Sequence, residues 1–329
     1  MENIKAGILG TGFYVPDKIL TNADIEKMVD TSDEWITTRT GIKERHIIGD
    51  KQTTSDLAMF AAQKALKNAK IDVSEVDCII VATITPDMPF PSTACILQNK
   101  IGAKTVCAFD VNAACCGFIY ALTMAKSFVE NDMFKKVLVV AADALSRIAD
   151  WTDRATCVLF GDGAGAAVVG RAIDNKRVIL DSYLGADGSA WDLLNMPAGG
   201  SQLPATHKTI DERLHFIKMN GNSVFKLAVR AMSNAAETVL AKCSLKNEDV
   251  DLVIPHQANL RIINALAQRL NAPLEKVWIN VTRYGNVSGA SVPIAMAEAD
   301  ASGQLKDGQI VLLDAFGAGL TWASAIIRW

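Results

Sequence analysis

VSEVDCIIVAT (residues 73–83) and KNEDVDLVIPH (246–256) are the stretches that decide the fold. Each begins in an acidic turn, passes through a Val-Asp pair and continues as an unbroken apolar strand. Such continuously apolar strands are typical of parallel sheets that are covered by helices on both faces. Because the pattern occurs twice in one chain, the sequence predicts two similar α/β halves.

Segments with helical and strand periodicity alternate along the whole chain, which is the pattern of an α/β protein. Each half closes with a glycine-rich loop and a strand, FGDGAGAAVVG from Phe160 and FGAGLTWASAIIRW from Phe316. We expect a duplication with halves at 1–170 and 171–329, although α/β proteins often look self-similar without one. The Gly-, Ser- and Pro-rich stretch 186–208 is expected to be a long surface loop.

Composition excludes several classes of function. The 329 residues are 50% hydrophobic, and the net charge is −3, so nucleic acid and anionic membranes are not expected as partners. No apolar run approaches the roughly 18 residues of a membrane span, and the N-terminus lacks a signal-peptide pattern, which predicts a cytoplasmic protein. Seven cysteines without a Cys-x-x-Cys pair argue against a disulfide framework or zinc site. Five of them are expected to pack in the core: Cys78, Cys95, Cys107, Cys157 and Cys243.

The stretch DVNAACCGFIY (110–120) contains two adjacent cysteines, Cys115 and Cys116, at the predicted start of a helix. The unpaired N–H groups and the dipole of a helix N-terminus favour a thiolate, so this position is expected to lower a cysteine pKa. The small neighbouring residues leave room for a substrate. The stretch by itself fits a nucleophile and a pair of packed thiols equally well.

Two further stretches carry polar groups at strand ends. His256 follows the apolar strand of residues 251–255 and precedes a helix, and the carboxyl ends of strands are where α/β proteins bind ligands. Asn286 lies in YGNVSGASVP (284–293), between small residues. A capping or core role for His256 and a simple turn role for Asn286 are the alternatives. Neither Gly-rich segment, GILGTGFYV (7–15) or GDGAGAAVVG (161–170), has the GxGxxG spacing, which disfavours a nucleotide-dependent oxidoreductase.

Together these motifs resemble the β-ketoacyl-acyl carrier protein synthase III family. The resemblance covers essentially the whole chain, and it includes DEWITTRTGIKERH (33–46), DVNAACCGF (110–118), PHQANLRI (255–262) and YGNVSGASVP. It implies the thiolase fold, an internally duplicated α/β sandwich of five layers. It also implies an acyltransferase that starts fatty-acid synthesis by condensing a short acyl-CoA primer with malonyl-acyl carrier protein, without a metal or other cofactor.

The resemblance assigns roles to particular residues. Cys115 matches the nucleophile, and Cys116 takes a position usually held by a small packing residue. His256 and Asn286 match the pair that stabilises the enolate formed when malonate loses CO2. The backbone N–H groups of Cys115 and Ala318 would form the oxyanion hole, with Ala318 standing where relatives carry glycine.

Binding residues also follow from the resemblance. Trp35 would stack on the CoA adenine with Arg154 on its other face, and Lys226 and Arg261 would meet the acidic carrier protein. Phe90 would reach into the acyl pocket of a twin subunit, which predicts a homodimer and a short primer. The remaining residues assigned to the CoA and acyl site are Arg39, Thr40, Asn222, Phe225, Asn259 and Phe316.

Relatives on the same scaffold remain as alternatives. A degradative thiolase needs a second cysteine in the C-terminal glycine loop, and no cysteine follows Cys243. The elongating synthases use two histidines where this chain has His256 and Asn286. A ketosynthase or acyltransferase of specialised metabolism would look alike at these positions and is the runner-up. A redox-sensing or binding protein would explain the cysteine pair, but not the other two motifs.

Overall fold

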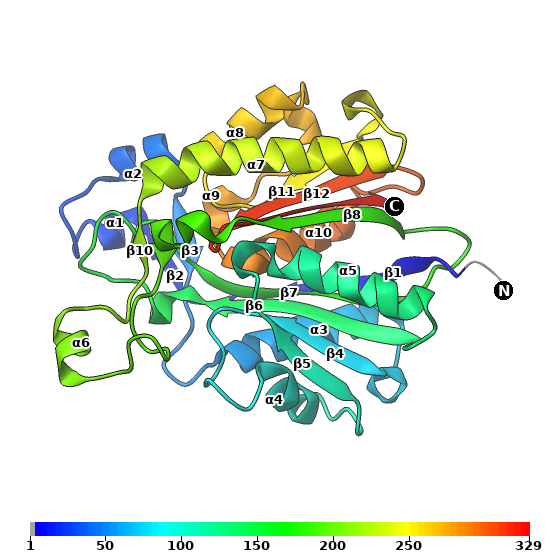
Figure 1. Cartoon of the computed structure of the whole chain (residues 1–329), viewed down its shortest axis with the longest axis horizontal. Helices are drawn as coiled ribbons and strands as arrows, with labels where there is room; N and C mark the ends of the chain where they lie inside the picture. Colours follow the sequence, from blue (N-terminus) through cyan, green and yellow to red (C-terminus); the bar gives the residue numbers. More distant parts are fainter. Residues whose placement is uncertain (1–3) are drawn as a thin grey trace.

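The computed structural model describes residues 4–329, and it is built around one nine-stranded mixed sheet with helices on both faces (Figure 1). The strand order is β11-β12-β13-β8-β1-β7-β6-β4-β5. The first half supplies β1 (Ala6–Tyr14), β4 (Cys78–Ala82), β5 (Cys107–Val111), β6 (Lys136–Ala144) and β7 (Asp162–Arg171). The second half supplies β8 (Val178–Ala186), β11 (Leu252–Pro255), β12 (Ile310–Gly317) and β13 (Thr321–Arg328).

The two halves repeat one topology, which confirms the predicted duplication. In the first, β4 runs parallel to β6, β6 antiparallel to β7, and β7 antiparallel to β1. In the second, β11, β12, β13 and β8 follow the same sequence of parallel and antiparallel pairs. A single parallel bridge between Val253 and Val277 takes the place that β5 occupies beside β4.

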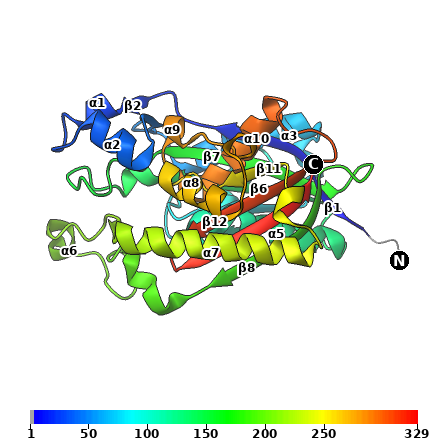
Figure 2. The same ribbon diagram turned by 90° about the horizontal axis from the view of Figure 1, so that it is seen from above.

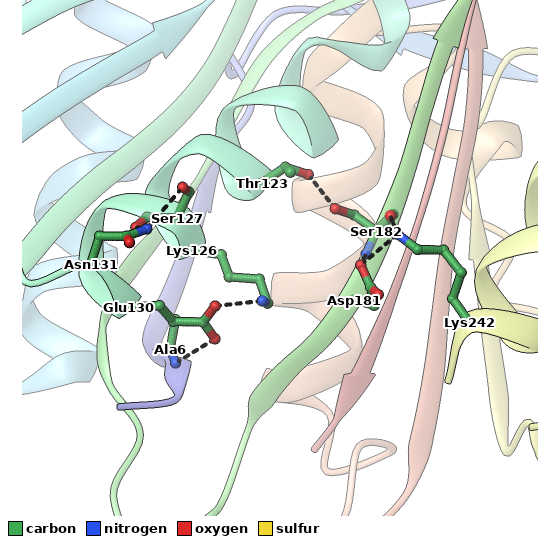
Figure 3. Close-up of polar contacts among 9 residues, drawn as sticks. All are labelled: Ala6, Thr123, Lys126, Ser127, Glu130, Asn131, Asp181, Ser182 and Lys242. Carbon is green, nitrogen blue, oxygen red and sulfur yellow. Dashed lines mark hydrogen bonds and ion pairs between the residues drawn. The ribbon is translucent and has the colours of Figure 1, made fainter. Parts of the chain in front are cut away.

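The halves join along a narrow seam. β1 and β8 share only one register pair, Gly7 with Val178, so the sheet is nearly divided there. Polar side chains of α5 (Gly117–Glu130) tie the two strands together (Figure 3). Thr123 bonds to Ser182 of β8 at 2.9 Å, and Glu130 accepts the Ala6 N–H of β1 at 3.3 Å.

The helices form three layers around the two halves of the sheet (Figures 1 and 2). α5 and α10 (Ser291–Ala301) lie between the halves and contribute to one apolar core with strands of both. α3 (Thr54–Ala69) and α4 (Thr93–Lys100) cover the outer face of the first half. α7 (Gly221–Lys242) and α8 (Leu260–Arg269) cover the outer face of the second. This is the five-layer sandwich that the sequence predicts.

Burial explains why these segments take these forms. All residues of β4 and β11 are buried, as expected for strands that are covered on both faces. α10 is apolar around most of its circumference because it sits in the central layer, whereas α7 and α8 bury one face. The N-cap residue of α3 is Thr53, whose backbone N–H donates to the Asp56 carboxylate at 2.9 Å.

The remaining helices and strands are short and lie outside the nine-stranded sheet. Stretch 186–208, predicted as a surface loop, in fact includes a 3-10 turn (Gly188–Leu193) and one strand of a small two-stranded antiparallel sheet. The short elements are β2 (Ile19–Thr21), α1 (Asn22–Ile25), α2 (Asp33–Thr40), β3 (Glu44–His46), β9 (Leu194–Asn195), α6 (His207–Asp211), β10 (Lys218–Met219) and α9 (Val281–Tyr284). No helix within residues 4–329 is long and apolar enough to cross a bilayer.

The prediction that five cysteines pack in the core was wrong for two of them. Cys78 and Cys157 are buried, and Cys243 is half-buried, but Cys95 and Cys107 are exposed. Cys107 begins β5, which is the edge strand of the sheet, so one side of it has no neighbouring strand. All seven cysteines are free thiols.

Candidate active site

Cys115 sits in a tight turn between β5 and α5. The 3-10 turn η2 (Ala114–Cys116) closes with a 3.0 Å bond from the Cys116 N–H to the Ala113 carbonyl, and Ala114 adopts a left-handed φ of 47°. Cys116 is fully buried in the central core, while Cys115 is only half-buried. The turn therefore presents one thiol to the site and packs the other.

Burial changes the expected acidity of Cys115. Desolvation raises the pKa of its thiol to about 12, the charge of Asp143 raises it further, and the Ser288 hydroxyl lowers it. The prediction of a lowered pKa is therefore not supported, because no cation adjoins the sulfur to offset burial. In the resting protein Cys115 is a thiol.

A second turn carries Asn286. The Asn286 N–H donates to the Leu159 carbonyl at 2.8 Å, and the Asn286 carbonyl accepts the Gly161 N–H at 3.0 Å. Its side-chain Oδ1 accepts the Ser288 N–H at 2.8 Å, which fixes the rotamer of the amide. Within residues 4–329 the Nδ2 group has no hydrogen-bond partner, so it remains able to donate to a ligand.

The two turns meet face to face. The Cys115 Sγ lies 3.6 Å from the Ser288 Oγ, to which the thiol donates. Ser288 begins η7 (Ser288–Ala290), and the next residue, Gly289, packs directly on the first turn. A Cβ atom at Gly289 would lie 3.0 Å from the Ala114 carbonyl oxygen, so this approach favours glycine.

His256 lies at the end of β11 and contacts the same turn. Its backbone N–H donates to the Asp314 carbonyl at 2.7 Å, and its Nδ1 lies 2.6 Å from the Ser291 Oγ. Burial lowers the pKa of His256 to about 4, so the imidazole is neutral near pH 7. Cys115, Asn286 and His256 thus all contact the segment 286–291, although they come from three distant parts of the sequence.

The C-terminal glycine loop lies beside Cys115. A Cβ atom at Gly317 would stand 2.7 Å from the Cys115 backbone nitrogen, closer than real Cβ contacts allow. The next residue, Ala318, is half-buried, and its N–H donates no hydrogen bond within the described residues. The Thr321 hydroxyl lies 3.1 Å from the Ala113 carbonyl and 3.2 Å from that of Ala318, which links this loop to the Cys115 turn.

Trp35 forms a cationic stack on the surface. The guanidinium of Arg154 lies 4.6 Å from the indole centroid, and that of Arg39 lies 4.9 Å from it. Arg154 also donates to the Asp30 carbonyl at 2.8 Å. The prediction had an adenine between Trp35 and Arg154, but the two side chains are in direct contact. Arg154 must move before a base can stack between them.

Thr40, which the resemblance assigns to the nucleotide end of the CoA site, is buried. It lies at the end of α2, where its hydroxyl donates to the Ile36 carbonyl at 2.7 Å and accepts the Ile42 N–H at 3.0 Å. The hydroxyl therefore orders the end of the helix, and Gly41 follows in a left-handed conformation.

The other predicted binding residues divide between the surface and the core. Asn259 caps α8 and donates from Nδ2 to the Arg39 carbonyl at 3.2 Å, so α8 adjoins the Trp35 stack. Arg261 lies over the Phe225 ring at 5.5 Å, which brings α7 to the same rim. Asn222 and Lys226 are exposed on α7. Phe316 is buried, and Phe90 is 83% exposed between β4 and α4.

Three residues of the site were not predicted: Asp143, Ser288 and Ser291. Both serines lie inside the stretch YGNVSGASVP that contains Asn286. Ser288 contacts Cys115 and Ser291 contacts His256, and these contacts form only when distant parts of the chain come together. Asp143 ends the apolar run of β6, and a charged residue at such a position was a signal in the sequence. Among residues 4–329 no cluster of three His, Cys, Asp or Glu side chains could hold a metal ion.

Comparisons with known proteins fit this arrangement. Family models for 3-oxoacyl-(acyl-carrier-protein) synthase III match residues 109–188, and those for its C-terminal part match 240–329. The β-ketoacyl-(acyl-carrier-protein) synthase III of Caldanaerobacter subterraneus subsp. tengcongensis is 58% identical, with 100% of this chain and 99% of that protein aligned.

Solved structures give the same result. The 3-oxoacyl-(acyl-carrier-protein) synthase III of Aquifex aeolicus is 50% identical and superposes with a TM-score of 0.91, covering 98% of this chain and all of that one. A priming β-ketosynthase of a polyketide biosynthetic pathway has the same TM-score but 34% identity, covering 99% and 97%. The runner-up from specialised metabolism is therefore not favoured. This chain belongs to the β-ketoacyl-acyl carrier protein synthase III family.

Proposed function

We propose that this chain transfers a short acyl group from acyl-CoA to Cys115 and condenses it with malonyl-acyl carrier protein. The product is a 3-ketoacyl-acyl carrier protein, and the reaction is the first condensation of fatty-acid synthesis. The observation that carries the proposal is the meeting of Cys115 with the turn between Asn286 and Ser291, which also holds His256.

Acylation is the first stage. The Cys115 sulfur attacks the thioester carbonyl, and the negative charge that develops on the carbonyl oxygen needs donors. The N–H groups of Cys115 and Ala318 supply them, since Gly317 lets the C-terminal loop approach the Cys115 nitrogen closely. The alanine at 318 keeps the N–H that this role requires.

Decarboxylation is the second stage. When malonyl-acyl carrier protein loses CO2, charge moves to the thioester oxygen as an enolate. Asn286 donates from Nδ2, because its Oδ1 is already held by the Ser288 N–H. His256 donates from Nε2 if Nδ1 accepts the Ser291 hydroxyl proton. Ser291 is suited to this because its oxygen already accepts the Gln257 N–H at 3.2 Å.

The carbanion then attacks the acyl carbonyl on Cys115, and Cys115 leaves as a thiolate. Loss of CO2 generates the carbanion, so the chemistry requires no metal, redox cofactor or external base. The division of labour supports halves near 1–170 and 171–329: the first supplies Cys115, and the second supplies His256, Asn286 and Ala318.

The rim formed by α2, α8 and the start of α7 is proposed as the CoA site. Trp35, Arg39 and Arg154 would hold the nucleotide after Arg154 moves off the indole. The pantetheine arm would pass between α7 and α8 to Cys115. The residues proposed along this path are Asn222, Phe225, Asn259 and Phe316.

Protein partners are proposed from the exposed residues of two faces. Lys226 and Arg261 project from neighbouring helices beside the rim and would attract an acidic carrier protein. Phe90 and Met88 are exposed beside the open edge of the sheet at β5, which supports a homodimer through this edge. Cytoplasmic location stays a prediction from the sequence.

The test is product formation. The protein is incubated with acetyl-CoA and malonyl-acyl carrier protein, and the carrier protein is analysed by intact mass. We expect the malonyl group on the carrier protein to be replaced by a 3-ketobutyryl group, with release of one CO2. Isobutyryl-CoA in a parallel reaction identifies the preferred primer. If neither primer yields a 3-ketoacyl product, the proposed function is wrong for these substrates.

A further inference from the structure

Asp143 is a buried carboxyl group for which neither half-reaction has a role so far. It lies near the end of β6 and is 1% exposed. Strand alternation puts it on the same face as Val139 and Ala141, which pack in the central core beneath η2. Its nearest strand neighbour is Gly163 of β7, which has no side chain to pair with it.

The two oxygens of Asp143 differ sharply. Oδ1 accepts three hydrogen bonds from the β4 end: the Ile84 N–H at 2.9 Å and the hydroxyls of Thr83 and Thr85 at 3.1 and 3.2 Å. Oδ2 is buried without a hydrogen-bond partner of normal length in the described chain. A buried carboxylate oxygen without a hydrogen bond destabilises the folded protein, so its presence requires an explanation.

Oδ2 faces the gap between the two turns. It would lie 3.8 Å from a Cβ atom at Gly289, and that same Cβ would lie 3.0 Å from the Ala114 carbonyl. The Ser288 hydroxyl is close enough to Asp143 to lower its pKa, and the Asp143 charge in turn raises the pKa of Cys115. Ser288 therefore stands between the thiol and the carboxylate.

The contact between the Cys115 thiol and the Ser288 hydroxyl offers a path for the thiol proton. Cys115 donates to the Ser288 Oγ, and the structure records no hydrogen bond from Cys115 to His256. His256 is also a weak proton acceptor, since burial lowers its pKa to about 4 and Nδ1 is engaged by Ser291. Ser288 can receive the Cys115 proton only if another group accepts the proton of the Ser288 hydroxyl. Oδ2 of Asp143 can do so, because it accepts no other hydrogen bond in the described chain.

We propose that Asp143, acting through the Ser288 hydroxyl, accepts the proton that Cys115 loses when it attacks the acyl-CoA thioester. The S–H bond breaks as the new S–C bond forms; the Cys115 proton moves to Ser288, and the Ser288 proton moves to Asp143 Oδ2. The bond between the acyl carbon and the CoA sulfur then breaks, and the leaving CoA sulfur takes up the proton from Asp143 through the Ser288 hydroxyl. The proposal rests on the proposed function, because it concerns the acylation stage.

The charges around Asp143 suit this role. Burial raises its pKa to about 6, so above that pH it is a carboxylate ready to accept a proton. The titratable groups facing this cluster are Cys115 and Cys116 of η2, His256 directly after β11, and Asp314 of β12. Asp162 bonds on the opposite face of the sheet, to Ser146 and the Ile48 N–H. Acylation should therefore rise with pH through about 6 and then level off.

The test uses Asp143→Asn, which keeps an acceptor for the Thr83, Ile84 and Thr85 donors but cannot take a proton. Single-turnover acylation by acetyl-CoA at pH 7.5 should fall about 100-fold, the size of a general-base contribution, and its rise near pH 6 should vanish. Alkylation of Cys115 by iodoacetamide should become faster, because removing the Asp143 charge lowers the pKa of the thiol. Pre-formed acyl-enzyme should condense with malonyl-acyl carrier protein within about 3-fold of the normal rate, since Cys115 is then the leaving group.

Two further variants complete the design. Ser288→Ala should show the same loss of acylation. Asp162→Asn removes a buried carboxylate from the other face of the sheet and should acylate normally. The proposal is overturned if Asp143→Asn acylates at the wild-type rate, or if acylation and condensation fall together. If the wild-type protein itself is not acylated, the proposed function fails instead, so the two failures are distinguishable.

Discussion

The turn of residues 112–117 and the turn of residues 286–291 are two copies of one structure, one from each half. Each begins with an asparagine whose Oδ1 accepts the N–H two residues later, at 3.3 Å in the first and 2.8 Å in the second. Each then passes through a left-handed residue, Ala114 with φ 47° or Ser288 with φ 45°. Each ends in a 3-10 turn that leads into a central helix.

Two differences between the copies matter for the chemistry: which residue stands at the tip of the turn, and how deeply the shared asparagine is buried. The first turn carries Cys115 where the second carries Gly289, so only one turn presents a nucleophile. The first asparagine, Asn112, is exposed, whereas Asn286 is buried and its Nδ2 makes no hydrogen bond within residues 4–329. In the proposed mechanism, a side-chain difference gives the first turn the nucleophile, and the burial of its asparagine makes the second turn the enolate donor.

The largest expected effect comes from Asn286→Ala. Removing one preorganised donor to a developing oxyanion should slow condensation about 10²- to 10³-fold. Loading of Cys115 by acyl-CoA should stay within about 3-fold, because no charge reaches Asn286 in that stage. Rapid-quench assays of the two stages separate them. An equal loss in both would mean that the second turn does not act selectively in decarboxylation.

Gly317→Ala should have the next largest effect. Its Cβ would stand 2.7 Å from the Cys115 nitrogen, so the loop carrying Ala318 must move away from the first turn. We expect acylation to slow about 10- to 100-fold through a weakened oxyanion hole, with a lowered melting temperature. Gly200→Ala is the matched control, since nothing lies within 4 Å of its Cβ position. An unchanged acylation rate in Gly317→Ala would remove this loop from the mechanism.

Arg45→Met tests what holds the second turn. Arg45 is fully buried and donates to the Val158 carbonyl at 2.7 Å and to Asn22 Oδ1 at 2.9 Å. Val158 directly precedes Leu159, whose carbonyl accepts the Asn286 N–H, and Phe160, which forms a parallel bridge with Asn286. Losing these donors should cost about 2–4 kcal/mol of unfolding free energy, because buried acceptors are left unpaired.

In the same variant, condensation should fall more than acylation, because Asn286 moves and Cys115 does not. Thermal unfolding and the two single-turnover assays measure these effects. Arg177→Gln is the control, since it removes an ion pair with Asp300 at the opposite end of the central helix α10. Equal losses in both stages would show that Arg45 supports the whole fold and not the second turn in particular.

Asn112→Ala should have the smallest effect. This asparagine occupies the position of Asn286 in the other turn, but its side chain is exposed and its hydrogen bond is 3.3 Å long. We expect both stages to stay within about 3-fold and the unfolding free energy to fall by less than about 1 kcal/mol. A large loss in condensation would contradict the division of labour between the turns.

Local patterns predicted most of the fold. The apolar strands predicted within 73–83 and 246–256 are β4 and β11, because burial on both faces makes a strand continuously apolar. The exposure of Cys107 could not be predicted, since it depends on β5 being the edge strand. Strand order is set by long-range pairing, which a single strand does not encode.

The sequence predicted those features of the site that depend on residue type. It did not predict the features that depend on burial and on contacts with residues distant in the sequence. Cys115, His256 and Asn286 stand out in their motifs, and the structure brings all three to one segment. The raised pKa of Cys115 was missed because burial there depends on both halves closing over the turn. The burial of Thr40 was not foreseen, because its hydroxyl is satisfied within its own helix end, a detail that its motif does not reveal.

The most direct test of the account asks which cysteine the first turn uses. The protein is incubated with acetyl-CoA, digested and analysed by peptide mass spectrometry, alongside Cys115→Ser and Cys116→Ser. The account predicts an acetyl group on the 110–120 peptide, absent in Cys115→Ser and retained in Cys116→Ser. A label that persists in Cys115→Ser and disappears in Cys116→Ser would contradict it.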